Sequence, residues 1–149
     1  MSRPGENEES RKALDRSVRV LAHRDHSAAS LRAKLARAGV SDDAQAEALD
    51  TLTRAGYLDD ARFARDRAAH LAERGYGDEW IRADLEAQGV AADVADPALD
   101  ILEAEAERAE RAAPRLGGGL RAARALARRG FSEESLERLV AQEPGAGVG

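Results

Sequence analysis

The amino-acid sequence predicts an all-α protein, an elongated tandem array of three three-helix repeats built from helix-turn-helix-like units. Three segments of similar sequence indicate the repeats: "SLRAKLARAGV" at 30–40, "WIRADLEAQGV" at 80–90 and "RAARALARRGF" at 121–131. Each segment ends in a glycine followed by an apolar residue, which is a common way for a helix to end. Only 3% of the residues are aromatic, and the 43% apolar content is rich in alanine. Such small side chains favour a row of shared small cores over one large core.

The first repeat is expected at 10–56, with helices at 10–24, 28–38 and 42–54. Ser27 is a suitable N-cap for the second of these helices. Gly39 can adopt the left-handed conformation after that helix, so that Val40 folds back onto Leu35. The same Leu-x₃-Gly-apolar pattern ends the third helix, at Leu52, Gly56 and Tyr57.

The second repeat is expected at 57–102, and it opens with two adjacent acids, Asp59 and Asp60. Two neighbouring carboxylates can form an acid/base or metal site, but that chemistry needs a pocket and two differently tuned groups. Capping explains both acids more simply, since Asp59 at the N-cap places Leu58 and Phe63 at the spacing of a hydrophobic staple. The helices are expected at 60–74, 78–88 (with Gly77 as N-cap) and from 93 onward.

The third repeat is expected at 103–141 and is shortened. A helix predicted over 93–113, with Pro97 in its first turn or at a break, leads into it. Helices at 119–129 and 133–141 follow, the second with Ser132 as N-cap. Residues 103–113 are mostly Ala, Glu and Arg, so this repeat should be the most loosely packed.

The two ends of the chain, 1–9 and 142–149, are expected to be disordered. No apolar run approaches the roughly 18 residues needed to span a bilayer, and "MSRPGENEES" does not resemble a signal peptide. The absence of cysteine fits a reducing compartment. These features predict a soluble, cytoplasmic monomer without a membrane partner.

The sequence offers no catalytic, cofactor-binding or metal-binding residues. His23 and His26 have a spacing that could hold a metal, but they lie at a helix end without a third cluster of ligands, and His70 is distant in sequence. The run Gly117–Gly119 lacks the Lys-Ser/Thr of a phosphate-binding loop and is typical of a connector. An enzyme is therefore not expected.

Charge is distributed unevenly along the chain, although the net charge is −5. Residues 61–77 carry four arginines against two acids, 78–113 three against eleven, and 114–131 five against none. On a helix, Arg121, Arg124 and Arg128 fall within about 60° of one another. This arginine stripe is either a solvated face or a contact for an acidic partner.

Two blocks resemble the RecX family of bacterial recombination regulators: "GYLDDARFA" at 56–64 followed by "RGYGDEWIRADLEAQGV" at 74–90, and "ARRGFSEESLERLV" at 127–140. The resemblance runs from about residue 12 to residue 141. It implies three tandem three-helix repeats without catalytic activity or cofactor. It also implies a modulator, usually an inhibitor, of RecA that lies in the groove of the RecA filament on single-stranded DNA.

Candidate contacts for RecA are the arginines of the basic segments and of the aligned helices: Arg62, Arg65, Arg74, Arg82, Arg121, Arg124 and Arg128. Two departures from the family pattern matter. Arg67 stands between Phe63 and Leu71, where an apolar residue is more usual, and the acidic net charge weakens the case for direct DNA binding.

Two other functions stay open at this point. One is a helical-repeat adaptor for another protein complex, since repeat arrays are generally binding surfaces. The other is a helix-turn-helix DNA-binding regulator, but helices such as "DEWIRADLEAQG" present mainly acids where base readout needs Arg, Asn or Gln.

Overall fold

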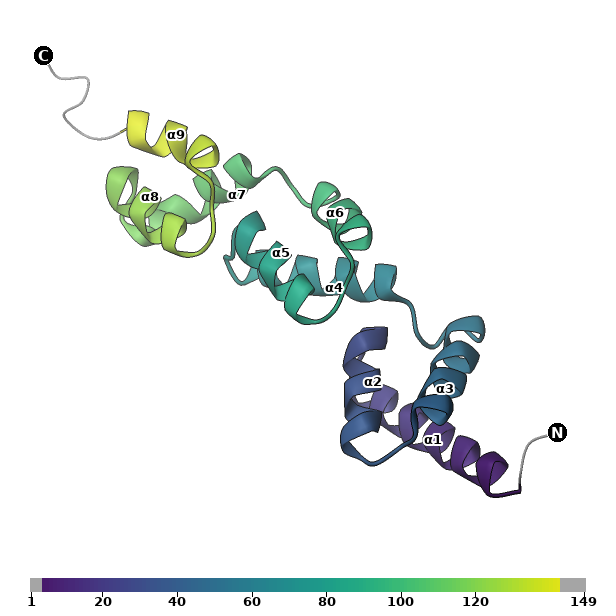
Figure 1. The fold of residues 1–149 in the computed structure, drawn as a ribbon. Helices are drawn as coiled ribbons and strands as arrows, with labels where there is room; N and C mark the ends of the chain where they lie inside the picture. Colours follow the sequence, from purple (N-terminus) through teal and green to yellow (C-terminus); the bar gives the residue numbers. More distant parts are fainter. Residues whose placement is uncertain (1–3, 143–149) are drawn as a thin grey trace, which may run out of the picture. The chain divides into compact units, whose positions relative to one another are not determined.

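A computed structural model describes residues 4–142 of the chain, and every regular element in this range is helical (Figure 1). In chain order the α-helices and one 3₁₀ turn are α1 (Pro4–His23), α2 (Ala28–Arg37), α3 (Asp42–Arg54), α4 (Asp60–Glu73), α5 (Asp78–Ala87), α6 (Ala92–Asp100), α7 (Glu105–Ala112), η1 (Ala113–Leu116), α8 (Gly119–Arg128) and α9 (Glu133–Ala141). The predicted all-α fold is confirmed.

The predicted caps account for where these helices end. Gly39 and Gly130 have φ values of +84° and +91°, a conformation that side chains rarely adopt. At four helix ends, the N–H of the residue after the glycine donates to a leucine carbonyl five residues earlier. The recorded N···O distances are 3.0 Å for Val40 to Leu35, 2.9 Å for Tyr57 to Leu52, 3.1 Å for Tyr76 to Leu71 and 3.1 Å for Phe131 to Leu126.

Helix starts also follow the predictions. Ser27 and Ser132 accept hydrogen bonds from the N–H groups three residues later. Asp59 accepts one from the N–H of Arg62 at 3.1 Å, which confirms its capping role. Asp60 does more than occupy the first turn of α4, because its carboxylate accepts from the N–H of Ala28 at 2.8 Å and so stabilises the start of α2.

The structure differs from the predicted boundaries in two places. Residues 4–9, expected to be disordered, belong to α1, which begins at Pro4, and proline is well suited to the first position of a helix. Glu9 of this segment accepts from the N–H of Ser41 at 2.9 Å. The expectation for residues 1–3 and 143–149 lies outside the described residues.

The second difference is the helix predicted over 93–113. Pro97 lies inside α6 without ending it, although proline cannot donate the backbone hydrogen bond to the preceding turn. The break comes at 101–104, and it begins four residues after the proline. The chain then resumes as α7, which leads into η1.

The chain divides into two compact units. The first comprises residues up to 64 together with 88–90, and its core gathers apolar side chains of α1, α2 and α3 around Leu31, Leu35 and Leu52. The second comprises 65–87 and the residues from 91 onward. Within it, a separate cluster around Leu126, Phe131 and Leu136 joins α7, α8 and α9. The boundaries predicted for the three repeats stay predictions.

Arg67 does not break the packing of α4. It is half-buried and forms a two-pronged ion pair with Asp84 of α5, in which Nη2 donates to Oδ1 at 2.9 Å and Nε donates to Oδ2. These hydrogen bonds raise the pKa of the Arg67 guanidinium above its ordinary value. An ion pair therefore takes the place of an apolar contact between the two helices.

Candidate protein-interaction surfaces

The arginine stripe of α8 has the geometry that the sequence predicts. Arg121, Arg124 and Arg128 are exposed, whereas Ala122 and Leu126 on the opposite side are almost completely buried. Among the described residues, no recorded ion pair joins these three arginines to a carboxylate. The charge of the stripe is thus available to a partner.

The other predicted contact residues are not equivalent to the stripe. Arg62 donates to the carbonyls of Gly56 and Tyr57 at 3.1 and 3.2 Å, so its guanidinium holds the end of α3. Arg82 pairs with Asp96 of α6 at 3.4 Å. Arg65 is exposed. The predicted contact arginines therefore differ in their surroundings: Arg62 and Arg82 have recorded partners within the chain, whereas Arg65 is exposed.

Arg74 belongs to an aromatic cluster that sequence reasoning did not identify. Tyr76 and Trp80 stack with ring centroids 4.7 Å apart, and the guanidinium groups of Arg74 and Arg129 lie 5.9 and 5.1 Å from the Tyr76 ring. Trp80 remains 45% exposed. Tyr76 precedes α5, so the stacking of its ring on Trp80 does not follow from helical periodicity.

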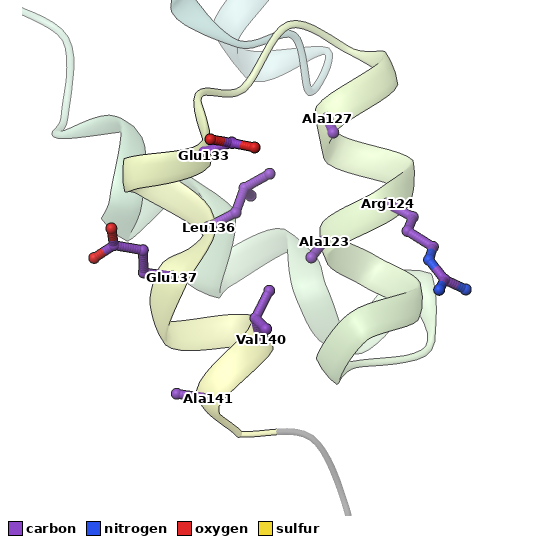
Figure 2. Close-up of a pocket in the computed structure, with 8 residues that line it drawn as sticks. All are labelled: Ala123, Arg124, Ala127, Glu133, Leu136, Glu137, Val140 and Ala141. Carbon is purple, nitrogen blue, oxygen red and sulfur yellow. The ribbon is translucent and has the colours of Figure 1, made fainter. Parts of the chain in front are cut away.

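A groove of about 540 Å³ lies between α8 and α9. Figure 2 shows Ala123 of α8 and Leu136 and Val140 of α9 directed into the space between the helices. The remaining lining residues form its edges: Arg124 and Ala127 on α8, and Glu133, Glu137 and Ala141 on α9. Arg124 is therefore both a member of the arginine stripe and an edge of an apolar groove.

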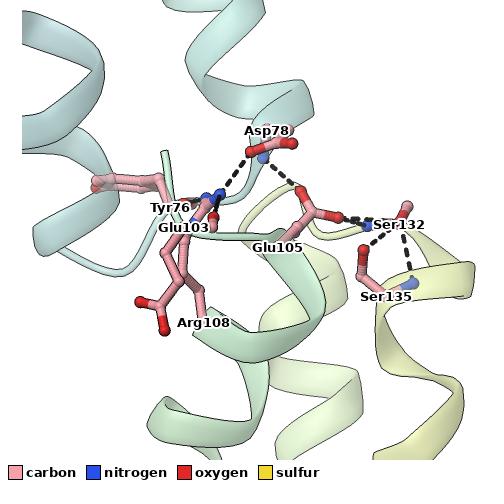
Figure 3. Close-up of polar contacts among 7 residues, drawn as sticks. All are labelled: Tyr76, Asp78, Glu103, Glu105, Arg108, Ser132 and Ser135. Carbon is pink, nitrogen blue, oxygen red and sulfur yellow. Dashed lines mark hydrogen bonds and ion pairs between the residues drawn. The ribbon is translucent and has the colours of Figure 1, made fainter. Parts of the chain in front are cut away.

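A polar network fixes the helices around this region (Figure 3). Arg108 of α7 donates to Asp78 at 2.7 Å and to the carbonyl of Tyr76 at 2.9 Å, and its side chain is only 9% exposed. Glu105 accepts from the N–H of Asp78 at 2.5 Å and from the N–H of Ser132 at 2.9 Å. The starts of α5 and α9 are thus both tied to α7.

The pKa of Glu105 reflects two opposing causes. Burial raises the pKa of its carboxyl group, but hydrogen bonds from Ser132, Ser135 and Asp78 to the ionised form outweigh burial, so that the pKa lies below its ordinary value.

Gly77 contributes a close approach of the backbone, because its N–H donates to the Arg129 carbonyl at 2.8 Å. A Cβ at Gly77 would lie 2.4 Å from the backbone of Gly130.

The histidines do not form a metal site. His26 is 2% exposed and its Nδ1 lies 3.0 Å from the hydroxyl of Ser30, while His23 is exposed. Within the described residues, no group of three or more His, Cys, Asp or Glu side chains could hold a metal ion.

None of the helices described is long and apolar enough to cross a membrane.

Comparison with known proteins gives a consistent result. The family model for the first three-helix domain of RecX matches residues 13–52, and the model for the second three-helix domain matches 59–99. The regulatory protein RecX of Stenotrophomonas maltophilia strain R551-3 is 34% identical over 141 residues, which cover 88% of this chain and 86% of that protein. The corresponding protein of Chromohalobacter salexigens is 42% identical over 86 residues, 58% of this chain and 57% of that protein.

Solved structures show the same fold at lower sequence identity. The crystal structure of RecX from Lactobacillus salivarius has a TM-score of 0.81 at 17% identity, covering 91% of this chain and 97% of that one. A second crystal structure of a regulatory protein RecX has a TM-score of 0.77 at 21% identity, covering 88% of this chain and 72% of that one.

Proposed function

Because this chain belongs to the RecX family of regulatory proteins, we propose that it binds RecA and the RecA filament on single-stranded DNA and inhibits recombinase activity. The observation that carries this proposal is its 34% identity to a regulatory protein RecX over most of both chains. The role would belong to DNA repair and the control of recombination. The protein would act by binding, without catalysis and without a cofactor.

The surface of the protein supports binding to an acidic partner. The arginine stripe of α8 is exposed and, among the described residues, has no recorded carboxylate partner. Exposed charge of this kind speeds and orients docking more than it adds affinity. We expect Arg121, Arg124 and Arg128 to guide the chain onto the filament, with any direct contact to DNA phosphates weak and dependent on salt.

The proposal is tested by RecA-driven strand exchange with increasing amounts of the full chain. The rate should fall as the chain is added. Inhibition far below one chain per RecA subunit would indicate that the chain caps filament growth, and inhibition near equal amounts would indicate that it coats the groove. An unchanged rate at several chains per RecA subunit would contradict the proposed function.

A further inference from the structure

The groove between α8 and α9 is open because the α8 residues that lie opposite Leu136 and Val140 are alanines. Ala123 and Ala127 lie four residues apart on the same side of α8, opposite Leu136 and Val140 of α9. Leu136 is buried and forms part of the floor, but Val140 is 45% exposed. A valine exposed over an apolar floor leaves surface that another side chain could cover.

The second repeat shows what is missing from the third. The two repeats align at an offset of 41 residues, so that Ala123 corresponds to Arg82 and Glu137 to Asp96. In the second repeat, Arg82 reaches from α5 to pair with Asp96 of α6 at 3.4 Å. In the third repeat the acid remains while the arginine has become an alanine.

The apolar positions differ in the same way. Val140 corresponds to Leu99 of α6, and Leu99 is only 5% exposed. Among the described residues, no ion pair or hydrogen bond is recorded for the side chain of Glu137. In the second repeat the carboxylate of Asp96 is paired and Leu99 is buried. Of their counterparts in the third repeat, Glu137 has no recorded ion pair within the described part of the chain, and Val140 remains exposed.

We propose that the α8–α9 groove is a docking site for one amphipathic helix of RecA, which supplies both a cation for Glu137 and apolar side chains for the groove. This inference rests on the proposed function, since the helix that it places in the groove belongs to RecA. Helices bind such grooves with apolar residues at i, i+3 or i+4 and i+7.

The charges at the edges favour this occupant over nucleic acid. Glu133 and Glu137 of α9 and Arg124 of α8 line the groove. Figure 2 shows the Glu133 carboxylate directed toward the space between the helices, whereas the side chains of Glu137 and Arg124 point outward from α9 and α8. Two carboxylates would repel phosphates. They match a helix that carries Lys or Arg on the flank beside α9 and an acid on the flank beside α8.

The test measures the affinity of full-length variants for RecA filaments on single-stranded DNA. Val140→Asp places a charge in the groove at an exposed position. Ala123→Arg places an arginine at the position that corresponds to Arg82. The new guanidinium is expected to pair with Glu137, as Arg82 pairs with Asp96, and its side chain should then fill the groove. Ile101→Asp is the matched control, because Ile101 is also an exposed aliphatic residue (66%) but lies outside the groove.

Both groove variants should bind filaments at least about tenfold more weakly than the wild-type chain, as expected when a central apolar contact is lost. Ile101→Asp should bind like the wild type. Each variant is checked for helical content and cooperative unfolding, and Val140→Asp keeps the test valid if Ala123→Arg does not fold.

Three outcomes would overturn the inference. Wild-type affinity in the folded Val140→Asp variant would remove the groove from the RecA interface while leaving the proposed function intact. Equal weakening by Ile101→Asp would show that added negative charge, and not the groove, is responsible. Concentration-dependent dimerisation of the wild-type chain that Val140→Asp abolishes would make a second copy the occupant. If the wild-type chain itself fails to bind, the proposed function is what fails.

Discussion

Single residues whose partners are close in sequence were predictable, and those with distant partners were not. Asp59, Ser27 and Ser132 each cap a helix through an N–H three residues later, so the capping hydrogen bond can be predicted from a short stretch of sequence. The pairing of Arg67 with Asp84 depends on how α4 meets α5. The sequence alone does not specify that geometry. Arg67, at a position expected to be apolar, therefore appeared to disturb the packing of α4.

Replacing the capping aspartate tests the residue-level account. Asp59→Ala removes the acceptor for the Arg62 N–H, and the free energy of unfolding should fall by about 1 kcal/mol. Inhibition of strand exchange, measured well below the melting temperature, should persist. If a fully folded Asp59→Ala chain no longer inhibits, Asp59 has a role in RecA binding beyond capping.

His26 should make the stability of the protein depend on pH. Burial lowers the pKa of its imidazole below the ordinary 6.5, the positive charges of Arg24 and Lys34 lower it further, and Asp25 opposes them. The unfolded chain therefore binds a proton more readily than the folded chain in the range just below pH 6.5. The stabilising effect of the neutral ring is present above pH 6.5 and is lost as the pH falls through the folded-state pKa.

Chemical denaturation at several pH values measures this effect. The free energy of unfolding of the wild-type chain should decrease between pH 6.5 and about pH 5, and His26→Gln, which carries no titrating group, should show a flatter profile. Glu105 titrates in a lower range, because its folded-state pKa lies below the ordinary 4.5. Identical profiles for wild type and His26→Gln above pH 5 would exclude His26 as the cause.

At the scale of helices, boundaries set by local chemistry were predicted to within about a residue. The ends of α2 and α8 follow from the glycine and leucine pattern that repeats along the chain, and α5 is followed by Gly89 with a φ of +78°. The start of α1 was missed because residues 4–9 are polar and charged, which is typical of a disordered end. Contacts from α1 to α3, such as Glu9 to Ser41, hold this segment in helical form.

The arginine stripe gives a prediction at the helix scale. Changing Arg121, Arg124 and Arg128 together to Gln preserves helix propensity while removing three positive charges. Affinity for RecA filaments should fall at low salt, and the difference from the wild type should shrink as salt is added, because salt screens the attraction of exposed charges.

A matched variant separates a local effect from a change in net charge. Arg11, Arg16 and Arg19 are exposed on α1, and their joint replacement by Gln removes the same charge from another helix. This variant should keep most of the wild-type affinity. Equal losses in both triple variants would mean that net charge matters and the position of the stripe does not. No loss in either would make the stripe a solvated surface.

At the scale of the whole molecule, the sequence predicted the repeats but not how they share cores. The two compact units divide within α4, and the Arg108 and Glu105 hydrogen bonds tie α5, α7 and α9 together in the second unit. These contacts join residues about 30 positions apart, beyond the reach of periodicity. The α8–α9 groove was also missed, since it depends on how the alanines of α8 face Leu136 and Val140 of α9. The elongated arrangement stays a prediction.

The central claim is that this chain binds RecA filaments, and sedimentation of filaments formed on single-stranded DNA tests it most directly. The chain should appear in the pellet with the filaments in a saturable manner, more weakly as salt is added, and should not sediment with single-stranded DNA alone to the same extent. A chain that stays in the supernatant at low salt, while RecA and DNA sediment fully, would contradict the account.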